Sequence, residues 1–188
     1  VIGLSADEVA IVFSYLPPKE IMHARVCTTW RDAAKKTTVP LLCTFYVKDV
    51  RSYNALRVIS TALPNLQQLR IGNLEDGHKF SDGEDPYEFI AAKTAHDHNC
   101  DINIISNFKK LKKLRIHSNS LNGIYPVFFN FPLLQSLELF VCYNLKWDLS
   151  MLSGCPQLRK FSYFSLTAYS PHSNLSSLRV LKNTLEEL

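Results

Sequence analysis

The sequence has no long hydrophobic run and no secretion signal. None of its apolar runs approaches the roughly 18 residues that a membrane-spanning helix needs. The residues after Val1 lack the charged and apolar regions of a signal peptide, although a chain that begins with valine gives no basis for judging its targeting. We therefore expect no association with a membrane.

The cysteines do not form a disulfide pattern. There are five, an odd number without paired spacing, at Cys27, Cys43, Cys100, Cys142 and Cys155. Disulfide frameworks use even numbers of cysteines at regular spacing, and reducing compartments keep thiols free. The cysteine content thus predicts reduced thiols in a cytoplasmic or nuclear protein.

Motifs for catalysis are also missing. The chain contains no glycine-rich phosphate loop and no nucleophile elbow, and no cysteine has a convincing catalytic partner. His96, His98 and Cys100 in "HDHNC" lack a second pair of ligands, so we interpret them as part of a solvated loop and not as a zinc site. We expect neither an enzyme nor a cofactor. An activity that depends on His96 and His98 is the remaining enzymatic alternative.

Positive and negative charges are unevenly distributed. The net charge is +4, yet the segment Glu75–Ile105 holds eight acidic and two basic residues. The rest of the chain holds 19 basic and nine acidic residues. An acidic segment in a basic chain affects the choice of partners and says nothing about the fold.

What the sequence does contain is a short motif that occurs four times. It reads "LPNLQQLRI" from Leu63, "FKKLKKLRI" from Phe108, "FPLLQSLEL" from Phe131 and "CPQLRKFSY" from Cys155. Equivalent residues of the last three copies are 23 and 24 residues apart. This period lies within the roughly 20–29 residues of leucine-rich repeats.

The spacing within each copy indicates a turn followed by a strand. Residues three apart fit a turn that enters a strand, and the last two apolar residues, two apart, share one face of that strand. No copy can bury its apolar edge alone, so we expect the copies to stack into an α/β solenoid with a concave parallel sheet. The shared spine is Leu66, Leu69 and Ile71, then Leu111, Leu114 and Ile116, then Leu134, Leu137 and Leu139, then Leu158, Phe161 and Tyr163.

Residues after the spine support the same interpretation. Asn119 and Cys142 each follow the last spine position by three residues, where their side chains can bond to loop backbone inside the coil. "LNGIYP" from Leu121 resembles the Leu-x-Gly-x-Ile-Pro segment of plant-type repeats, with Tyr125 as an extra residue. The alternative is one amphipathic helix per copy, which "FKKLKKL" taken alone would fit.

The first two copies are unusually far apart. Leu69 and Leu114 are separated by 45 residues, about two periods. An acidic insertion at 75–105 or a divergent repeat would both explain this distance. Within it, "DPYEFIAAKTA" predicts a short helix with Asp85 as its N-cap and Pro86 at its first position.

The first 40 residues do not follow the repeat. Ser5 and Glu8 have the spacing of a capping box, which predicts a helix that ends before Pro17. Pro18 can open a second helix, and a third is expected over about 28–36. So short a segment cannot easily bury all its apolar residues among themselves, so either the repeats or another protein must cover them.

This N-terminal segment resembles an F-box. That pattern has an apolar stripe, "Ile/Val-Phe-Ser-Tyr-Leu", an acidic or proline-rich corner and "Val-Cys-x-x-Trp-Arg". The matching residues are Leu4, Glu8, Val12, Phe13, Ser14, Tyr15, Leu16, Val26, Cys27, Trp30 and Arg31, whereas Ser5 replaces the usual proline. The chain as a whole resembles F-box proteins with leucine-rich repeats, with a helical module at 1–40 and a repeat domain at 41–188.

The resemblance implies a substrate receptor of a Skp–cullin–F-box ubiquitin ligase. In that family the F-box binds a Skp-type adaptor attached to a cullin, and the repeats hold a target protein while other subunits catalyse ubiquitin transfer. The residues it implies for the adaptor surface are Leu4, Val9, Val12, Phe13, Leu16, Ile21, Val26, Cys27 and Trp30, with Phe13 and Trp30 as anchors. Each can instead be a core residue of the helices, and the chain can instead be a leucine-rich-repeat scaffold that binds no adaptor.

Target binding would use side chains of the repeat strands that lie between and beside the spine. They are Arg70, Lys113, Arg115, His117, Ser136, Glu138, Phe140, Lys160, Ser162 and Phe164. A basic patch with two exposed aromatic residues favours an acidic protein segment with an apolar anchor. The alternative is an ordinary solvated sheet face. We expect no nucleic-acid partner, because lysines alternating with buried leucine in "KKLKK" fit the polar side of a strand and turn.

Overall fold

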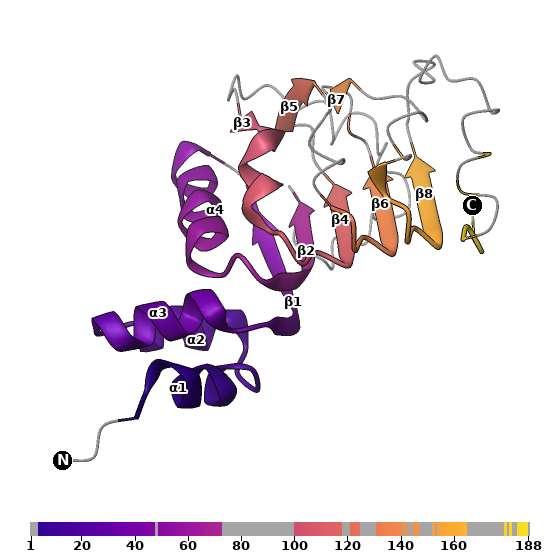
Figure 1. Ribbon diagram of the computed structural model, residues 1–188. Coiled ribbons are helices and arrows are strands. Elements are labelled where there is room, and N and C mark those ends of the chain that lie inside the picture. Colours follow the sequence, from indigo (N-terminus) through magenta and orange to yellow (C-terminus); the bar gives the residue numbers. More distant parts are fainter. Residues whose placement is uncertain are drawn as a thin grey trace, which may run out of the picture.

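The computed structural model contains N-terminal helices followed by two parallel sheets (Figure 1). It describes residues 4–47, 49–72, 100–117, 121–124, 131–140, 142, 145–146, 152, 154–164, 179, 181 and 184–187. The expected α/β class with a parallel sheet is confirmed. Among the described residues, no helix has the length and apolar character of a bilayer-spanning segment.

Three short helices open the chain near the predicted positions, but the first ends at Phe13 instead of continuing up to Pro17. They are α1 (Ala6–Phe13), α2 (Pro18–Ala24) and α3 (Thr28–Lys36). The capping box of α1 is present, because the Glu8 N–H donates to Ser5 Oγ at 3.3 Å and the Ser5 N–H donates to the Glu8 carboxylate at 2.8 Å. Hydrogen bonds from the backbone and then the hydroxyl of Ser5 hold the pKa of Glu8 below its usual value.

The helices contribute their own buried side chains to the core. These are Val9, Phe13, Ile21, Ala33 and Ala34, none of which is more than 2% exposed. The rings of Phe13 and Trp30 meet edge to face, with their centroids 5.8 Å apart. This aromatic contact joins α1 to α3 in the centre of the helical module.

Hydrogen bonds fix the helical module to the sheet. Asn65, in the turn before β2 (Leu66–Gly72), donates from its side-chain amide to the carbonyls of Lys35 and Lys36 at 2.9 and 3.3 Å. These carbonyls end α3 and have no partner within the helix. The buried Thr37 hydroxyl donates to the Ala33 carbonyl at 2.8 Å. The junction therefore satisfies the end of α3 and holds it beside the sheet.

The main sheet is built from the repeated motif. Its strand order is β1 (Val39–Tyr46), β2, β4 (Lys113–His117), β6 (Ser136–Phe140) and β8 (Lys160–Phe164). The last four strands contain the four copies, and the buried spine is in register from Leu69 to Leu114, Leu137 and Phe161. The predicted stacking of the copies is confirmed, and the alternative of one helix per copy is wrong.

The sheet has an edge strand that the motif did not reveal. β1 pairs with β2 in parallel, and α4 (Val50–Ala62) makes the crossover that such a pair requires. The register of β1 shifts between Val39 and Leu42. Leu41 and Leu42 are both exposed there, so β1 does not show the apolar spacing of the other strands.

The long segment between the first two copies adds no strand to the main sheet, because β2 pairs directly with β4. An insertion therefore describes it better than a second complete repeat. Its last part forms β3 (Cys100–Asp101) and the 3-10 helix η1 (Ile102–Asn107), which packs against α4. The helix expected at Asp85 lies outside the described residues.

A second, smaller sheet accompanies the first. It is formed by β3, β5 (Leu121–Ile124) and β7 (Leu145–Lys146) (Figure 1). Between the sheets, Cys142 Sγ lies 3.5 Å from the Ile116 carbonyl oxygen and 3.3 Å from that of Phe140. Cys142 therefore bonds to backbone as predicted, but the acceptors are carbonyls of strands β4 and β6 and not of a loop, whereas Asn119 lies outside the described residues.

Truncating the aromatic centre of the helical module is expected to destabilise the protein. Phe13→Ala should lower the free energy of unfolding by about 3–5 kcal/mol, because it leaves a cavity beside Trp30. Urea unfolding followed by the fluorescence of Trp30, in a chain that carries Trp147→Phe, measures this change. Ile11→Ala is the control, since Ile11 lies on the same helix but is 64% exposed. Equal losses for the two variants would contradict the described core.

Cysteine alkylation should follow burial. Burial raises the pKa of both Cys43 and Cys155 to about 12, so both thiols stay protonated at neutral pH. Cys27 is exposed at the start of α3. Iodoacetamide should label Cys27 in the native protein and the other two only in denaturant, as read by peptide mass spectrometry. Labelling of Cys43 at the rate of Cys27 would contradict its burial.

Candidate protein-interaction surfaces

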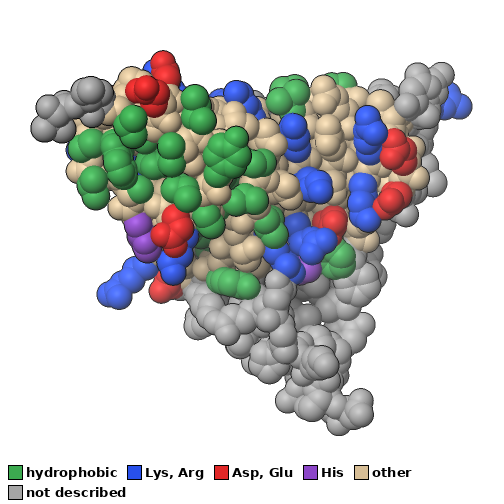
Figure 2. All heavy atoms as spheres, turned by 90° about the horizontal axis from the view of Figure 1, so that it is seen from below, with side chains coloured by type: hydrophobic (Ala, Val, Ile, Leu, Met, Phe, Trp, Pro, Cys, Tyr) green, Lys and Arg blue, Asp and Glu red, His purple; other side chains and the backbone are tan. Residues whose placement is uncertain are grey.

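The helical module leaves a group of large apolar side chains uncovered. Leu4, Ile11, Val12, Tyr15 and Val26 are all more than half exposed, and Tyr15 and Val26 reach 80% and 77%. Figure 2 shows hydrophobic side chains gathered over the end of the molecule that carries the helices. A contiguous exposed apolar surface indicates an interaction site, whereas single exposed residues do not. We call these five residues the outer helical patch.

The helix α1 is apolar on more than one face. Val9 and Phe13, four residues apart, point into the core. Ile11, Val12 and Tyr15 lie on the remaining surface of the same segment. A helix that had only to cover its own core would carry polar residues at these positions. α1 therefore carries more apolar surface than its own core uses.

The residues implied for the adaptor surface divide into two groups. Leu4, Val12, Val26 and Cys27 are exposed, and Leu16 and Trp30 are partly exposed. The structure corrects the placement of Val9, Phe13 and Ile21, which fill the interior of the module and are not available at its surface. Phe13 in particular is held by Trp30, so it stabilises the module and does not serve as an anchor for a partner.

Two exposed residues were not among those implied for the surface. Ile11 lies two residues from both Val9 and Phe13, which puts it on the opposite side of α1 from the core. Tyr15 follows the end of α1, just before Pro17 turns the chain. Helical periodicity was a usable signal for Ile11. No signal in the sequence identified Tyr15, because the predicted helix continued up to Pro17, whereas α1 ends at Phe13.

A second candidate surface is the outward face of the main sheet. Its residues form three rows across β1, β2, β4, β6 and β8: Leu42, Gln68, Lys113, Ser136 and Lys160; Thr44, Arg70, Arg115, Glu138 and Ser162; and Tyr46, Gly72, His117, Phe140 and Phe164. The residues predicted to face a target therefore lie side by side. The side chain of Phe164 lies outside the described part of the structure.

Ion pairs reduce the positive charge of this face. Arg115 Nε lies 2.6 Å from Glu138 Oε2, and Lys160 Nζ lies 2.7 Å from Glu187 Oε2. The hydrogen bond to Glu187, followed by the charges of Glu187 and Glu138, raises the pKa of Lys160. Two of the basic residues predicted to meet an acidic target therefore already have carboxylate partners. The face is less basic than the sequence alone indicates.

Aromatic side chains lie at the end of the same face. The rings of His117 and Phe140, on neighbouring strands, are in contact with their centroids 4.4 Å apart and an interplanar angle of 42°. Both side chains are partly exposed. This pair supplies apolar surface beside the charged middle row, the combination that protein-binding faces commonly use.

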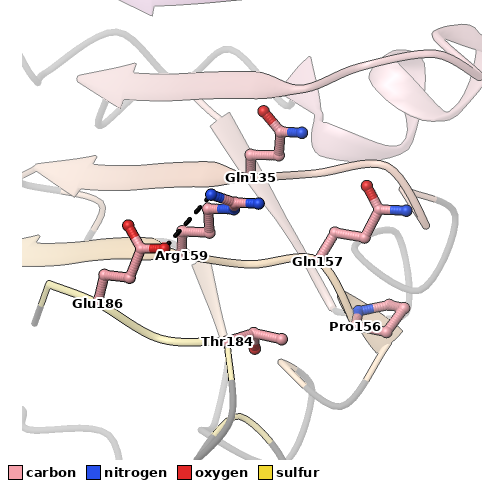
Figure 3. Close-up of a pocket in the computed structure, with 6 residues that line it drawn as sticks. All are labelled: Gln135, Pro156, Gln157, Arg159, Thr184 and Glu186. Carbon is pink, nitrogen blue, oxygen red and sulfur yellow. Dashed lines mark hydrogen bonds and ion pairs between the residues drawn. The ribbon is translucent and has the colours of Figure 1, made fainter.

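A shallow hollow of about 210 Å³ opens where the strands begin, beside β8 (Figure 3). It is lined by Gln135, Pro156, Gln157, Arg159, Thr184 and Glu186. The only charged pair in its wall, Arg159 Nη1 and Glu186 Oε1, is exposed and 3.3 Å apart. The backbone N–H groups of residues 186 and 187 donate to the Arg159 carbonyl. The hollow is therefore the space between two successive turns and offers no catalytic arrangement.

No metal centre appears in the part of the chain that the structure describes. Among those residues, no three side chains of histidine, cysteine, aspartate or glutamate come together to hold an ion. His96 and His98 lie outside the described residues, so the interpretation of "HDHNC" stays a prediction.

Known proteins give one point of comparison. No protein-family model matches the chain. The chain is similar to an F-box/LRR-repeat protein of Arabidopsis thaliana, with 28% identity over 165 residues. The similar region makes up 78% of this chain and 39% of that protein, so the chain spans about two fifths of its relative's length. This similarity supports, at most, a relationship to proteins of the F-box and leucine-rich-repeat type.

Proposed function

We propose that the chain is a non-catalytic substrate receptor of a Skp–cullin–F-box ubiquitin ligase. The helical module would bind a Skp-type adaptor and through it a cullin, and the main sheet would bind a target protein. The observation that carries the proposal is the outer helical patch, an apolar surface that the chain itself leaves uncovered. The name of the Arabidopsis relative supports the same assignment. We place this function in the cytoplasm or nucleus.

The arrangement of the two candidate surfaces fits such a receptor. α1, which carries Ile11 and Val12 of the outer helical patch, lies on the side of α3 that points away from the sheets (Figure 1). The outward face of the sheet belongs to different elements. An adaptor and a target can therefore bind at the same time, which a receptor requires. The hydrogen bonds of Asn65 to α3 hold the two surfaces in a defined orientation.

The apolar patch is large enough to drive association. Complete burial of a large apolar side chain contributes about 1.5–3 kcal/mol, and the patch has five such residues. Loss of translational and rotational freedom opposes binding by several kcal/mol, on the order of 4–15. The two ranges overlap, so a specific complex requires complementary pockets on the partner. Holding a target near the charged ubiquitin carrier would then raise the effective concentration of its lysines.

Removal of a patch residue should weaken adaptor binding without unfolding the protein. Tyr15→Ala is expected to weaken binding to a purified Skp-type adaptor about 30-fold, the effect of losing a central aromatic contact. Calorimetry measures the affinity, and thermal melting should be unchanged. Val58→Ala is the matched control, because Val58 is 53% exposed but lies on α4.

Other outcomes distinguish the alternatives. A folded wild-type chain that does not bind the adaptor would favour the leucine-rich-repeat scaffold. Phe13→Ala is not a suitable test, since loss of binding there would follow from loss of the module's core.

The two surfaces should select different proteins from cells. Phe140→Ala removes an aromatic side chain from the sheet face, and Tyr15→Ala alters only the helical patch. Co-purification followed by mass spectrometry should show adaptor and cullin lost with Tyr15→Ala and kept with Phe140→Ala. A target protein should show the reverse. Loss of the same set of proteins in both variants would argue against separate adaptor and target surfaces.

A further inference from the structure

The second copy of the motif differs from its neighbours at four equivalent positions where the strands begin. In the second copy these positions hold Lys109, Lys110, Lys112 and Lys113. The first copy has Pro64, Asn65, Gln67 and Gln68 there, and the third has Pro132, Leu133, Gln135 and Ser136. We call the four lysines the lysine edge.

The fold does not require these charges. The Lys109 N–H donates to the Pro64 carbonyl at 2.9 Å, and the Lys112 N–H donates to the Gln67 carbonyl at 2.8 Å. The same backbone contact recurs one copy later, where the Gln135 N–H donates to the Lys112 carbonyl at 2.7 Å. Main-chain groups alone make these bonds, so uncharged side chains satisfy the same structure. Four adjacent positive charges repel one another and gain nothing from the stacking of the copies.

The lysine edge also has no negative partner within the described structure. Three of its lysines are exposed and Lys112 is half-buried. Neighbouring basic residues are paired, such as Lys36 with Asp7 at 2.9 Å and Arg159 with Glu186 at 3.3 Å. None of the ion pairs among the described residues involves a lysine of the edge. Its charge is therefore available to a second molecule.

The lysine edge lies beside the helical module. The strands begin on the lower side of Figure 1, which is the side that faces the viewer in Figure 2. On that face, Lys and Arg side chains gather next to the hydrophobic cluster over the helices. The turn that contains Asn65 joins the two regions, since Asn65 bonds to the end of α3 and Pro64 bonds to Lys109. One partner can cover both.

We propose that the lysine edge binds an acidic segment of the same partner that covers the outer helical patch. This inference rests on the proposed function, under which that partner is the Skp-type adaptor. An apolar centre with a charged rim is the usual composition of a protein interface, and rim charges mainly raise the association rate. The partner would thus carry a cluster of aspartate and glutamate residues beside its apolar groove.

Two other occupants fit less well. The acidic insertion of this chain leaves β2 at Gly72, the opposite end of the strand from Pro64 and the lysine edge. Single-stranded nucleic acid is usually held by aromatic side chains on which bases stack, and the four positions and their flanking spine residue Leu111 supply none.

The test is the salt dependence of the association rate. A variant with Lys109→Gln, Lys110→Gln, Lys112→Gln and Lys113→Gln should bind the purified adaptor about tenfold more slowly at roughly 50 mM salt. The difference should vanish at about 500 mM salt, and the dissociation rate should change little. Biolayer interferometry measures both rates. The control is Arg159→Gln with Lys160→Gln. These two basic residues lie at the equivalent positions of the fourth copy, outside the lysine edge, and already have carboxylate partners.

Each other result has a defined meaning. An unchanged association rate in the lysine variant, with Tyr15→Ala still losing the adaptor, overturns this inference and leaves the proposed function intact. Absence of adaptor binding by the wild-type chain overturns both. Loss of binding to a single-stranded RNA probe with an unchanged adaptor rate assigns the edge to nucleic acid. If neutralising the carboxylates of 75–88 accelerates adaptor binding only when the lysines are present, the occupant is this chain's own insertion.

Discussion

The structure depends on one constraint: a single copy of the motif cannot bury its own spine. Leu114 is covered only because Leu69 and Leu137 stand beside it on neighbouring strands, in register and on the same face. The parallel pairing fixes this register, since a slip of one residue would turn the spine outward. The same pairing decides what faces solvent. Residues between the spine positions are placed in straight rows, which is how separate copies come to form one binding face.

The helical module differs from the repeats, because some of its apolar residues are not covered by neighbouring elements. Its core is small, and at its centre Phe13 packs edge to face on the partly exposed Trp30. Stacked strands would cover further apolar residues, but α1 lies away from the sheets, so Tyr15 and Val26 remain exposed. A domain of this size buries a smaller fraction of its surface than a larger one. Apolar side chains that exceed the needs of this core therefore contribute little to the stability of the free chain.

Local signals in the sequence were sufficient for the helices and for the repeated strands. Ser5, Pro17 and Pro18 mark boundaries through backbone chemistry that does not depend on distant contacts. β1 was missed because its register shift exposes Leu41 and Leu42, which breaks the spacing on which the prediction relied.

Assignment to surface or core was less predictable. A resemblance identifies which residues matter, yet Phe13 and Tyr15 occur in the same short run and face opposite ways. Helix phase separates them only once the ends of α1 are known. In the same way, sequence showed the basic residues of the sheet face but not their partners. Arg115 is matched to Glu138 because two strands far apart in sequence are adjacent in the sheet, and no local pattern reports that.

Apolar and charged surfaces have separate tasks in such an arrangement. Burial of apolar area is short-ranged and contributes most of the affinity, but it does not guide a partner from a distance. Unpaired charge acts over about a Debye length, roughly 8–10 Å, and selects partners before contact. The turn at Pro64 and Asn65 links Lys109 to the end of α3 through hydrogen bonds, so a charge of the second copy lies next to the helical module. The Arg115–Glu138 pair, neutral overall, exerts a much weaker field. Under the proposed function, charge placement would direct one partner to the helices and leave the sheet face to a partner selected by shape.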